Sequence, residues 1–313
     1  MNSTLNQLHR PPGIPLAALA AALDATSLAV RDEGSRLIVV HPSGRTTVDV
    51  LPMTEASLDD AAPFAAVRVR TVLEGEVAAS LTAPGQLSSL NAFAALGALT
   101  AGDDGVYVGS RLTVYTHENA WAVHLPLLLA AVLHGAPAPL GALAHALGQG
   151  GAAGEPSAWG AADFASVARV LAPVCSCNAG GRGFTAEFAL ERGQGSAGAG
   201  DRATALWQLR ADQPHPAAGG GLFCLLELPH RFHDAAALEA AAERLNRLEM
   251  EARDLPPHFG AWCRSQYSGL LAYVSFLPNE LHAAAGIATN LSIWACARAQ
   301  WAHRTLRSEA VSR

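Results

Sequence analysis

The clearest hydrophobic pattern in the chain is a period of two that occurs in paired stretches. Residues 67–73 (VRVRTVL) and 222–228 (LFCLLEL) both place apolar or small side chains at every second position. Such alternation predicts strands with one buried face. We expect strands near 36–41, 46–51, 66–73, 183–191, 203–211 and 221–228, and hairpins at 105–116 and 258–277. The remaining apolar stretches predict helices at 14–24, 86–99, 119–134, 160–172, 234–251 and near 283–306.

An internal repeat organises these elements. The pair Leu90-Asn91 recurs 155 positions later as Leu245-Asn246, and at the same offset GVYVGS at 105–110 aligns with GAWCRS at 260–265. LTVY at 112–115 aligns with LLAY at 270–273 at an offset of 158, which a longer hairpin turn in the second half would explain. Because missing a repeat misassigns a fold, we take this one as the primary feature. Each half is then an α-β-β-β-α-β-β-α unit.

This order of elements predicts an α+β fold, with antiparallel sheets that carry helices packed on them. We expect a tail at 1–13, a first repeat at 14–134 and a second repeat at 158–308. The linker at 135–157 contains a short predicted helix at 140–147 and a stretch rich in Gly and Ala. The predicted helix 14–24 could be mistaken for a signal peptide, but its counterpart 160–172 is internal, so we interpret it as part of the fold.

Composition excludes several chemistries. The chain has 313 residues, half of them hydrophobic, and a formal net charge of -6. All 21 basic residues are Arg, so a Walker A lysine, a Schiff base and a lysine general base are excluded. The mild negative charge argues against nucleic acid as a partner. No apolar run is long enough to span a membrane, and five cysteines, an odd number, favour reduced thiols. We therefore expect a cytoplasmic protein.

Two short motifs suggest chemistry but have simpler explanations. G-x-G-x-x-G at 193–198 follows a predicted strand, yet another strand pattern follows it where a dinucleotide-binding unit needs a helix. A flexible hairpin loop is the better interpretation. His230, His233 and Asp234 could hold a metal ion, but no further ligand cluster accompanies them. Asp234 is also a good N-cap for the helix that follows.

Two further clusters are treated in the same way. Cys175 and Cys177 are separated by one residue, where redox and zinc pairs usually have two, and they have no partner pair. We interpret them as reduced thiols at a turn. His117-Glu118-Asn119 could be a base with its orienting group, but the second half keeps Asn-Glu without the His, which favours helix capping. We assign no catalytic, cofactor-binding or metal-binding residue.

The second half carries a family resemblance. RLNRLEMEA at 244–252 is followed by FGAWCRS at 259–265 and LLAYVSFLP at 270–278; SLNAFAALG, GVYVGS and RLTVY fit more loosely in the first half. The arrangement resembles the type III secretion chaperones and the related YbjN-like bacterial proteins, as two tandem copies. Those chaperones are small acidic homodimers that hold an extended segment of a client protein. The resemblance implies that two copies in one chain form an intramolecular pseudo-dimer.

The sequence therefore predicts a non-catalytic protein-binding protein, chaperone-like or regulatory, rather than an enzyme. Its partner would be a client protein, with no cofactor, and the chain would be a monomeric pseudo-dimer or a homodimer. Arg68 and Arg70 form a basic stripe that suits an acidic peptide, or a solvated strand face. Four tryptophans are candidates for partner contact or for the cores and the interface between the halves: Trp121, Trp262, Trp294 and Trp301. The alternative is an enzyme or small-ligand binder with its site between the repeats, where His117, His230 and His233 would converge.

Overall fold

The structure is a computed structural model. It describes residues 16–26, 28–41, 44–52, 63–81, 85–102, 105–115, 121–135, 155–191, 203–252 and 255–311. The predicted tail at 1–13, the short helix at 140–147, the glycine motif at 193–198 and the cluster at 117–119 lie outside these residues.

The first repeat is built around one antiparallel sheet with strand order β1-β2-β3-β4-β6-β5. Its strands are β1 (Ala29–Asp32), β2 (Arg36–His41), β3 (Gly44–Pro52), β4 (Pro63–Val72), β5 (Ala98–Gly102) and β6 (Gly105–Tyr115). Its helices are α1 (Leu16–Asp24), α2 (Gly75–Ser80), α3 (Gln86–Asn91) and α4 (Trp121–His134).

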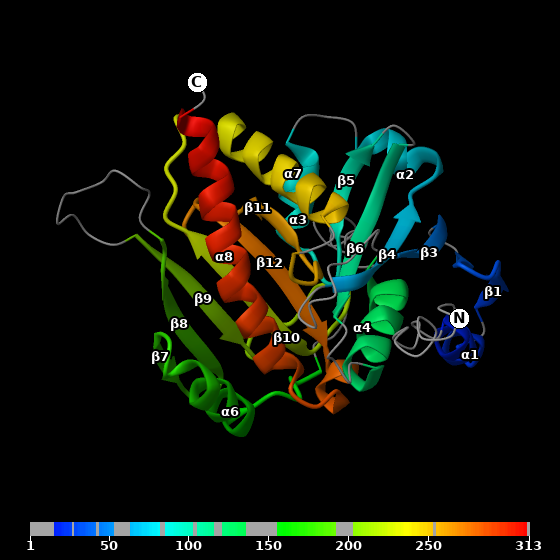
Figure 1. Ribbon diagram of the computed structural model, residues 1–313, viewed down its shortest axis with the longest axis horizontal. Coiled ribbons are helices and arrows are strands. Elements are labelled where there is room, and N and C mark those ends of the chain that lie inside the picture. Colours follow the sequence, from blue (N-terminus) through cyan, green and yellow to red (C-terminus); the bar gives the residue numbers. More distant parts are fainter. Residues whose placement is uncertain are drawn as a thin grey trace, which may run out of the picture.

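The second repeat has the same plan, with strand order β7-β8-β9-β10-β12-β11. Its strands are β7 (Ser176–Ala179), β8 (Gly183–Ala189), β9 (Thr204–Arg210), β10 (Gly221–Leu228), β11 (Ala261–Arg264) and β12 (Leu271–Pro278). Its helices are α6 (Ala161–Leu171), α7 (Ala235–Glu251), the 3₁₀ turn η2 (Asn279–Ala283) and α8 (Ile287–Val311). Figure 1 shows the two sheets side by side, with α3 and α7 where they meet.

The predicted α+β class and the two similar antiparallel sheet units are confirmed, and they fit a tandem duplication. Each unit has one strand more than predicted, because β1 and β7 were missed. Both are four-residue edge strands whose side chains are mostly exposed. A strand without a buried face shows no alternation, so the hydrophobic pattern could not reveal it.

The prediction was wrong for residues 86–116. The expected helix 86–99 ends at Asn91, and the expected hairpin 105–116 is the single long strand β6. The hairpin partner of β6 is β5, which begins at Ala98, within the last residues of the expected helix. Asn91 explains the change, because its side chain accepts a hydrogen bond from Leu99 N (2.8 Å) and donates one to Leu99 O (3.0 Å). These bonds tie the helix end to β5 in place of further helical turns.

The same bonds correct the alignment of the repeats. Asn246 accepts from Trp262 N (2.7 Å) and donates to Trp262 O (2.9 Å), so Asn91 and Asn246 are equivalent as predicted. Leu99 is therefore equivalent to Trp262, β5 to β11 and β6 to β12. The predicted matches of 105–110 with 260–265 and of 112–115 with 270–273 are wrong.

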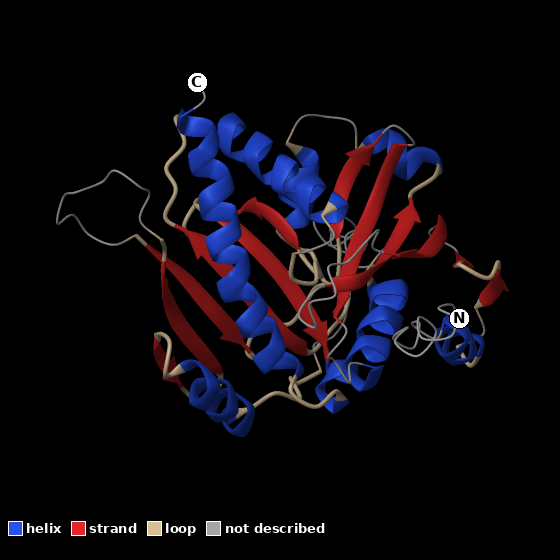
Figure 2. Ribbon diagram, viewed as in Figure 1, coloured by secondary structure: helices blue, strands red, loops and turns tan. Residues whose placement is uncertain are grey.

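Each sheet has one face under the helices of its own repeat. The alternating residues of β4 that include Val67 and Val69 are buried on this face, and α1 and α4 cover it. In the second repeat α6 and α8 cover the corresponding face, and Figure 2 shows α8 running across the strands. The opposite faces, here called the outer faces, carry Arg68 and Arg70 in β4 and Phe223 and Leu225 in β10. Within the described residues, no helix combines the length and apolar character that a membrane span requires.

Candidate binding grooves and the buried network between the repeats

The two repeats contact each other reciprocally. Arg111 N in β6 donates to His258 O (2.9 Å), and Phe276 N in β12 donates to Ala95 O (2.9 Å). The register of the sheets makes Arg111 equivalent to Phe276, because they pair with the equivalent residues Arg68 and Phe223. Each strand thus binds the loop that precedes the edge strand of the other repeat. This is the contact pattern of a two-fold symmetric dimer, formed within one chain.

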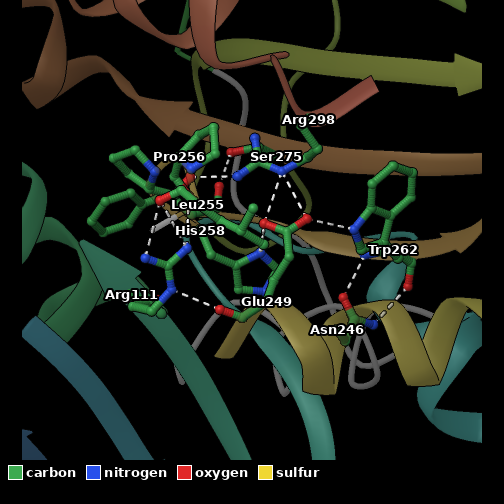
Figure 3. A network of polar contacts seen from close by, with 12 residues as sticks. Arg111, Asn246, Glu249, Leu255, Pro256, His258, Trp262, Ser275 and Arg298 are labelled. Carbon is green, nitrogen blue, oxygen red and sulfur yellow. Dashed lines mark hydrogen bonds and ion pairs between the residues drawn. The ribbon is translucent and has the colours of Figure 1, made fainter. Parts of the chain in front are cut away.

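The side chains at this interface are not symmetric. Ala95 and Phe276 pack together on one side. On the other side a polar network surrounds Glu249, which is 1% exposed (Figure 3). Its carboxylate accepts from Trp262 Nε1 (2.7 Å) and Arg298 Nε (2.9 Å), and lies 3.1 Å from His258 Nδ1. The guanidinium of Arg298 lies 4.1 Å from the centre of the Tyr273 ring.

Arg111 brings the first repeat into this network. It is 1% exposed, and its side chain donates to Glu249 O (2.6 Å) and Pro256 O (2.8 Å), as well as to Leu255 O. These acceptors are main-chain carbonyl groups of the second repeat. The buried positive charge of Arg111 is therefore compensated by hydrogen bonds to the backbone of the other repeat. Thr113 beside Arg111 also donates to Leu255 O (2.6 Å).

Electrostatics fixes the protonation states in the network. Burial alone would raise the pKa of Glu249, but Arg298 and His258 outweigh it and lower that pKa to about 2. Burial lowers the pKa of His258, against the opposing effect of Glu249. The carboxylate is therefore ionised and the imidazole neutral near pH 7. His258 and Glu249 are 0% and 1% exposed, so the network is buried, and Arg111 connects it to the first repeat.

The network depends on an insertion found only in the second repeat. Asn91 and Leu99 are eight residues apart, whereas the equivalent Asn246 and Trp262 are sixteen apart. Helix α7 continues past Asn246 to Glu251, while α3 ends at Asn91. The additional residues carry Glu249 and the carbonyl groups that bind Arg111.

A groove of about 890 Å³ lies on the outer face of the first sheet, against the end of α7. Gly109 in β6 lets α7 approach, because a Cβ there would lie 2.8 Å from Met250 Cε. Five of the lining residues are arginines, from β2, β3, β4 and α7: Arg36, Arg45, Arg68, Arg70 and Arg247. We call this site the arginine groove.

Asp49 partly neutralises the arginine groove. It is 5% exposed, and Arg36 Nε donates to its carboxylate at 2.6 Å, while an NH2 group of Arg70 lies at 3.6 Å. Glu243 and Glu251 of α7 complete the charged lining. Tyr107 also lines the groove, and burial raises the pKa of its phenol, so it is a neutral donor near pH 7.

A second pocket, of about 300 Å³, lies at the equivalent place on the second sheet, against the residues that follow α3. Phe223 and Leu225 stand where the first sheet has Arg68 and Arg70. Val274 and Phe276 stand where it has Gly109 and Arg111. Other lining residues include Phe93, His215 and Tyr267. We call this site the aromatic pocket.

The predicted partner-binding residues are distributed unequally. Arg68 and Arg70 line the arginine groove, where the structure adds Arg36, Arg45 and Arg247. Trp262 is 0% exposed and donates to Glu249, so it has no surface for a partner and we withdraw it. Trp294 and Trp301 on α8 are half-buried against the core. Trp121 begins α4, and its side chain lies outside the described residues.

The predicted helix cap is confirmed, and His230 and His233 belong to the second repeat and do not lie between the repeats. Asp234 caps α7 by accepting from Ala237 N (2.8 Å). His230 Nε2 lies 3.0 Å from His303 Nδ1 inside the second repeat, and burial lowers the pKa of His230 to about 4. His233 is exposed beside Asp234. Within the described ranges, no three His, Cys, Asp or Glu side chains are grouped as metal ligands would be.

The cysteines are free thiols. Cys175 follows α6 and Cys177 lies in β7, and their thiols donate to Leu171 O (3.4 Å) and Ala168 O (3.8 Å). Cys224 and Cys263 are fully buried, and burial raises the pKa of both thiols, to about 12 for Cys263.

In comparisons with known proteins, no protein-family model, curated protein or solved structure matches the chain. The fold and the grooves define a duplicated α+β protein with two outer sheet faces, one lined by arginine and one by aromatic and aliphatic side chains.

Proposed function

We propose that this chain is a non-catalytic protein-binding protein, chaperone-like or regulatory, that works as an intramolecular pseudo-dimer. A partner protein would lie on the outer face of the first sheet. The arginine groove is the observation that carries this proposal. It is a recess of about 890 Å³ that is walled on one side by the sheet of the first repeat and on the other by α7 of the second.

The construction of the interface supports the proposal. Both walls of the groove keep their relative position because Arg111, a neighbour of Arg68 across the strands, is locked into the second repeat. A rigid groove loses little conformational entropy when a partner binds. The groove between the two repeats is also consistent with the resemblance to secretion chaperones. In those proteins, paired units hold a segment of a client.

The test is site-specific photo-crosslinking in the native host. A photo-reactive phenylalanine analogue replaces Thr47, a lining residue of the groove, and in a matched variant it replaces Ile293, which is 45% exposed on α8. We expect one protein to crosslink through position 47 and not through position 293. The same crosslinks from both positions, or none from position 47, would contradict the proposal.

The aromatic pocket favours a second candidate function, binding of a small ligand between the repeats. Its walls come from both, since Phe93 belongs to the first repeat and Val274 to the second, and His215 Nε2 lies 2.8 Å from Phe93 O across the boundary. The crosslinking experiment separates the candidates. A protein captured at position 47 supports the first, and a small molecule that copurifies and is lost in Val274→Trp supports the second.

A further inference from the structure

The arrangement of charge in the arginine groove identifies the kind of segment that fits it. Five arginines and two glutamates line the groove, and Asp49 lies beneath them. Positive charge is therefore in excess here, although the whole chain has a net charge of -6. Local excess positive charge in a recess attracts an anionic partner.

The arginines occupy three successive cross-strand rows. Arg68 pairs with Asp49, Arg70 with Thr47, and Val72 with Arg45. These rows are two residues apart along the strands, which corresponds to roughly 6.6–6.8 Å. Because alternate residues share a face, an arginine projects from the outer face in each row. The row of Arg68 also contains Arg36, the partner of Asp49 on β2.

Among the residues that the structure describes, Arg70 has donors that lack a close acceptor. Arg36 holds Asp49 at 2.6 Å, whereas Arg70 reaches it only at 3.6 Å. The Nε atom of Arg70 is buried without a hydrogen-bond partner. Each guanidinium has five N–H donors and prefers planar carboxylates that it can bind through two of them. The side chain of Arg70 is 34% exposed, so an additional carboxylate in the groove could reach its exposed part.

An extended peptide repeats its side chains with the same spacing as the rows. Carboxylates at positions i, i+2 and i+4 of a strand lie on one side, roughly 6.6–6.8 Å apart. We propose that the arginine groove recognises an extended acidic segment of a partner protein, with Asp or Glu at alternate positions. This inference rests on the proposed function and names the segment that the partner would present. A nucleic acid fits less well, because it would extend beyond the groove over a chain whose net charge is -6.

The experiment uses the full chain and fluorescein-labelled peptides of about nine residues, the two acidic ones having the same composition. One peptide has three glutamates at alternate positions among serines, the second has them adjacent, and a third has glutamine in their place. Fluorescence anisotropy at low salt measures each dissociation constant. We expect the alternating peptide to bind at least about tenfold more tightly than the adjacent one, and the glutamine peptide not to bind. The expected ratio corresponds to about 1.4 kcal/mol.

Two variants complete the test. Arg68→Gln with Arg70→Gln is expected to weaken binding of the alternating peptide more than about tenfold. The matched control, Arg169→Gln with Arg231→Gln, removes two exposed arginines away from the groove and is expected to leave binding unchanged. Equal binding of the two acidic peptides would overturn the inference. An equal loss of peptide binding in the two variants would overturn it as well. If one of these results is found and position 47 still crosslinks a protein, the proposed function is retained. Only the inference that the partner presents an acidic segment is then wrong.

Discussion

The outer faces of the two sheets occupy equivalent places in equivalent repeats, yet their chemistry is opposite. In the first repeat, Arg68 and Arg70 face a groove beside α7. In the second, Phe223 and Leu225 at the same positions face a pocket beside Phe93. The backbone pairing is the same in both, because it depends on the inner face, where both strands bury apolar residues.

The difference continues into the interface. Arg111 and Phe276 make the same backbone contact with the other repeat, but one enters a polar network and the other packs on Ala95. Outer-face residues lie outside the large core under the helices, and Leu225 and Val274 form a smaller cluster of their own, so these residues can diverge after duplication without loss of the fold. The repeats thus share a scaffold and differ in what they can bind.

The largest expected effect comes from removing the carboxylate at the centre of the buried network. Glu249→Ala leaves Arg298 buried without its carboxylate and Trp262 Nε1 without its acceptor. We expect the free energy of unfolding to fall by about 3–5 kcal/mol, measured by urea denaturation at pH 7. Glu243→Ala, an exposed change on the same helix, is expected to stay within about 0.5 kcal/mol.

A double variant shows whether the loss is electrostatic. Adding Arg298→Met to Glu249→Ala removes the uncompensated charge and is expected to recover part of the stability. A single variant that loses less than about 1 kcal/mol would show that the Glu249 carboxylate does not stabilise the buried network.

Lower pH should weaken both repeats, since each contains a desolvated histidine. Burial lowers the pKa of His124 on α4 to about 4, and burial and His303 lower that of His230 to about 4. The unfolded value is 6.5, so the unfolded state binds more protons between pH 4 and 6.5. The free energy of unfolding therefore has its full value above pH 6.5. It decreases as the pH falls toward 4, by an amount on the order of 2–3 kcal/mol for each histidine.

Urea denaturation between pH 7 and 4.5 measures this dependence. His124→Gln and His230→Gln are each expected to flatten the pH dependence, while His233→Gln, at an exposed position, leaves it unchanged. Hydrogen exchange at pH 4.5 would show which repeat opens first. If neither buried-histidine variant changes the slope, the desolvation explanation is wrong.

The smallest expected effect on stability comes from a variant in which the outer face of the first sheet receives residues of the second. Arg68→Phe with Arg70→Leu places the β10 residues on β4. Both arginines are partly exposed, so we expect little change in stability. Binding of the alternating glutamate peptide should weaken at least about tenfold, or about 1.4 kcal/mol, in the anisotropy assay. Unchanged affinity would mean that the side chains of β4 do not select the partner.

Part of the candidate site was visible in the sequence. Arg68 and Arg70 alternate with Val67 and Val69, so a shared, polar strand face follows from the period of two. Arg36 lies on a predicted strand and Arg45 directly precedes another, but only the register brings them beside β4. Arg247 belongs to the other repeat, and no spacing along the chain indicates that it faces the same groove.

The network around Glu249 was hidden for a related reason. A glutamate within a charged helix normally indicates a solvated face, and Glu243 on the same helix behaves in that way. The Glu249 carboxylate is compensated by Arg298, 49 residues away, and Arg111, 138 residues away, binds the main-chain carbonyl of the same residue. The Asp234 cap, by contrast, is a contact over three residues, and it was predicted correctly.

The sequence by itself determined the duplicated α+β plan, most strands and the start of α7 at the Asp234 cap. It also determined that Asn91 and Asn246 are equivalent in the two repeats. These features depend on local periodicity, capping and self-similarity, which neighbouring residues encode. The tertiary structure alone decided which face of each sheet meets the other repeat, the register that assembles the arginine rows, and the burial of Arg111 and Glu249. Those depend on contacts between distant segments, and their free energy exists only once both repeats have folded against each other.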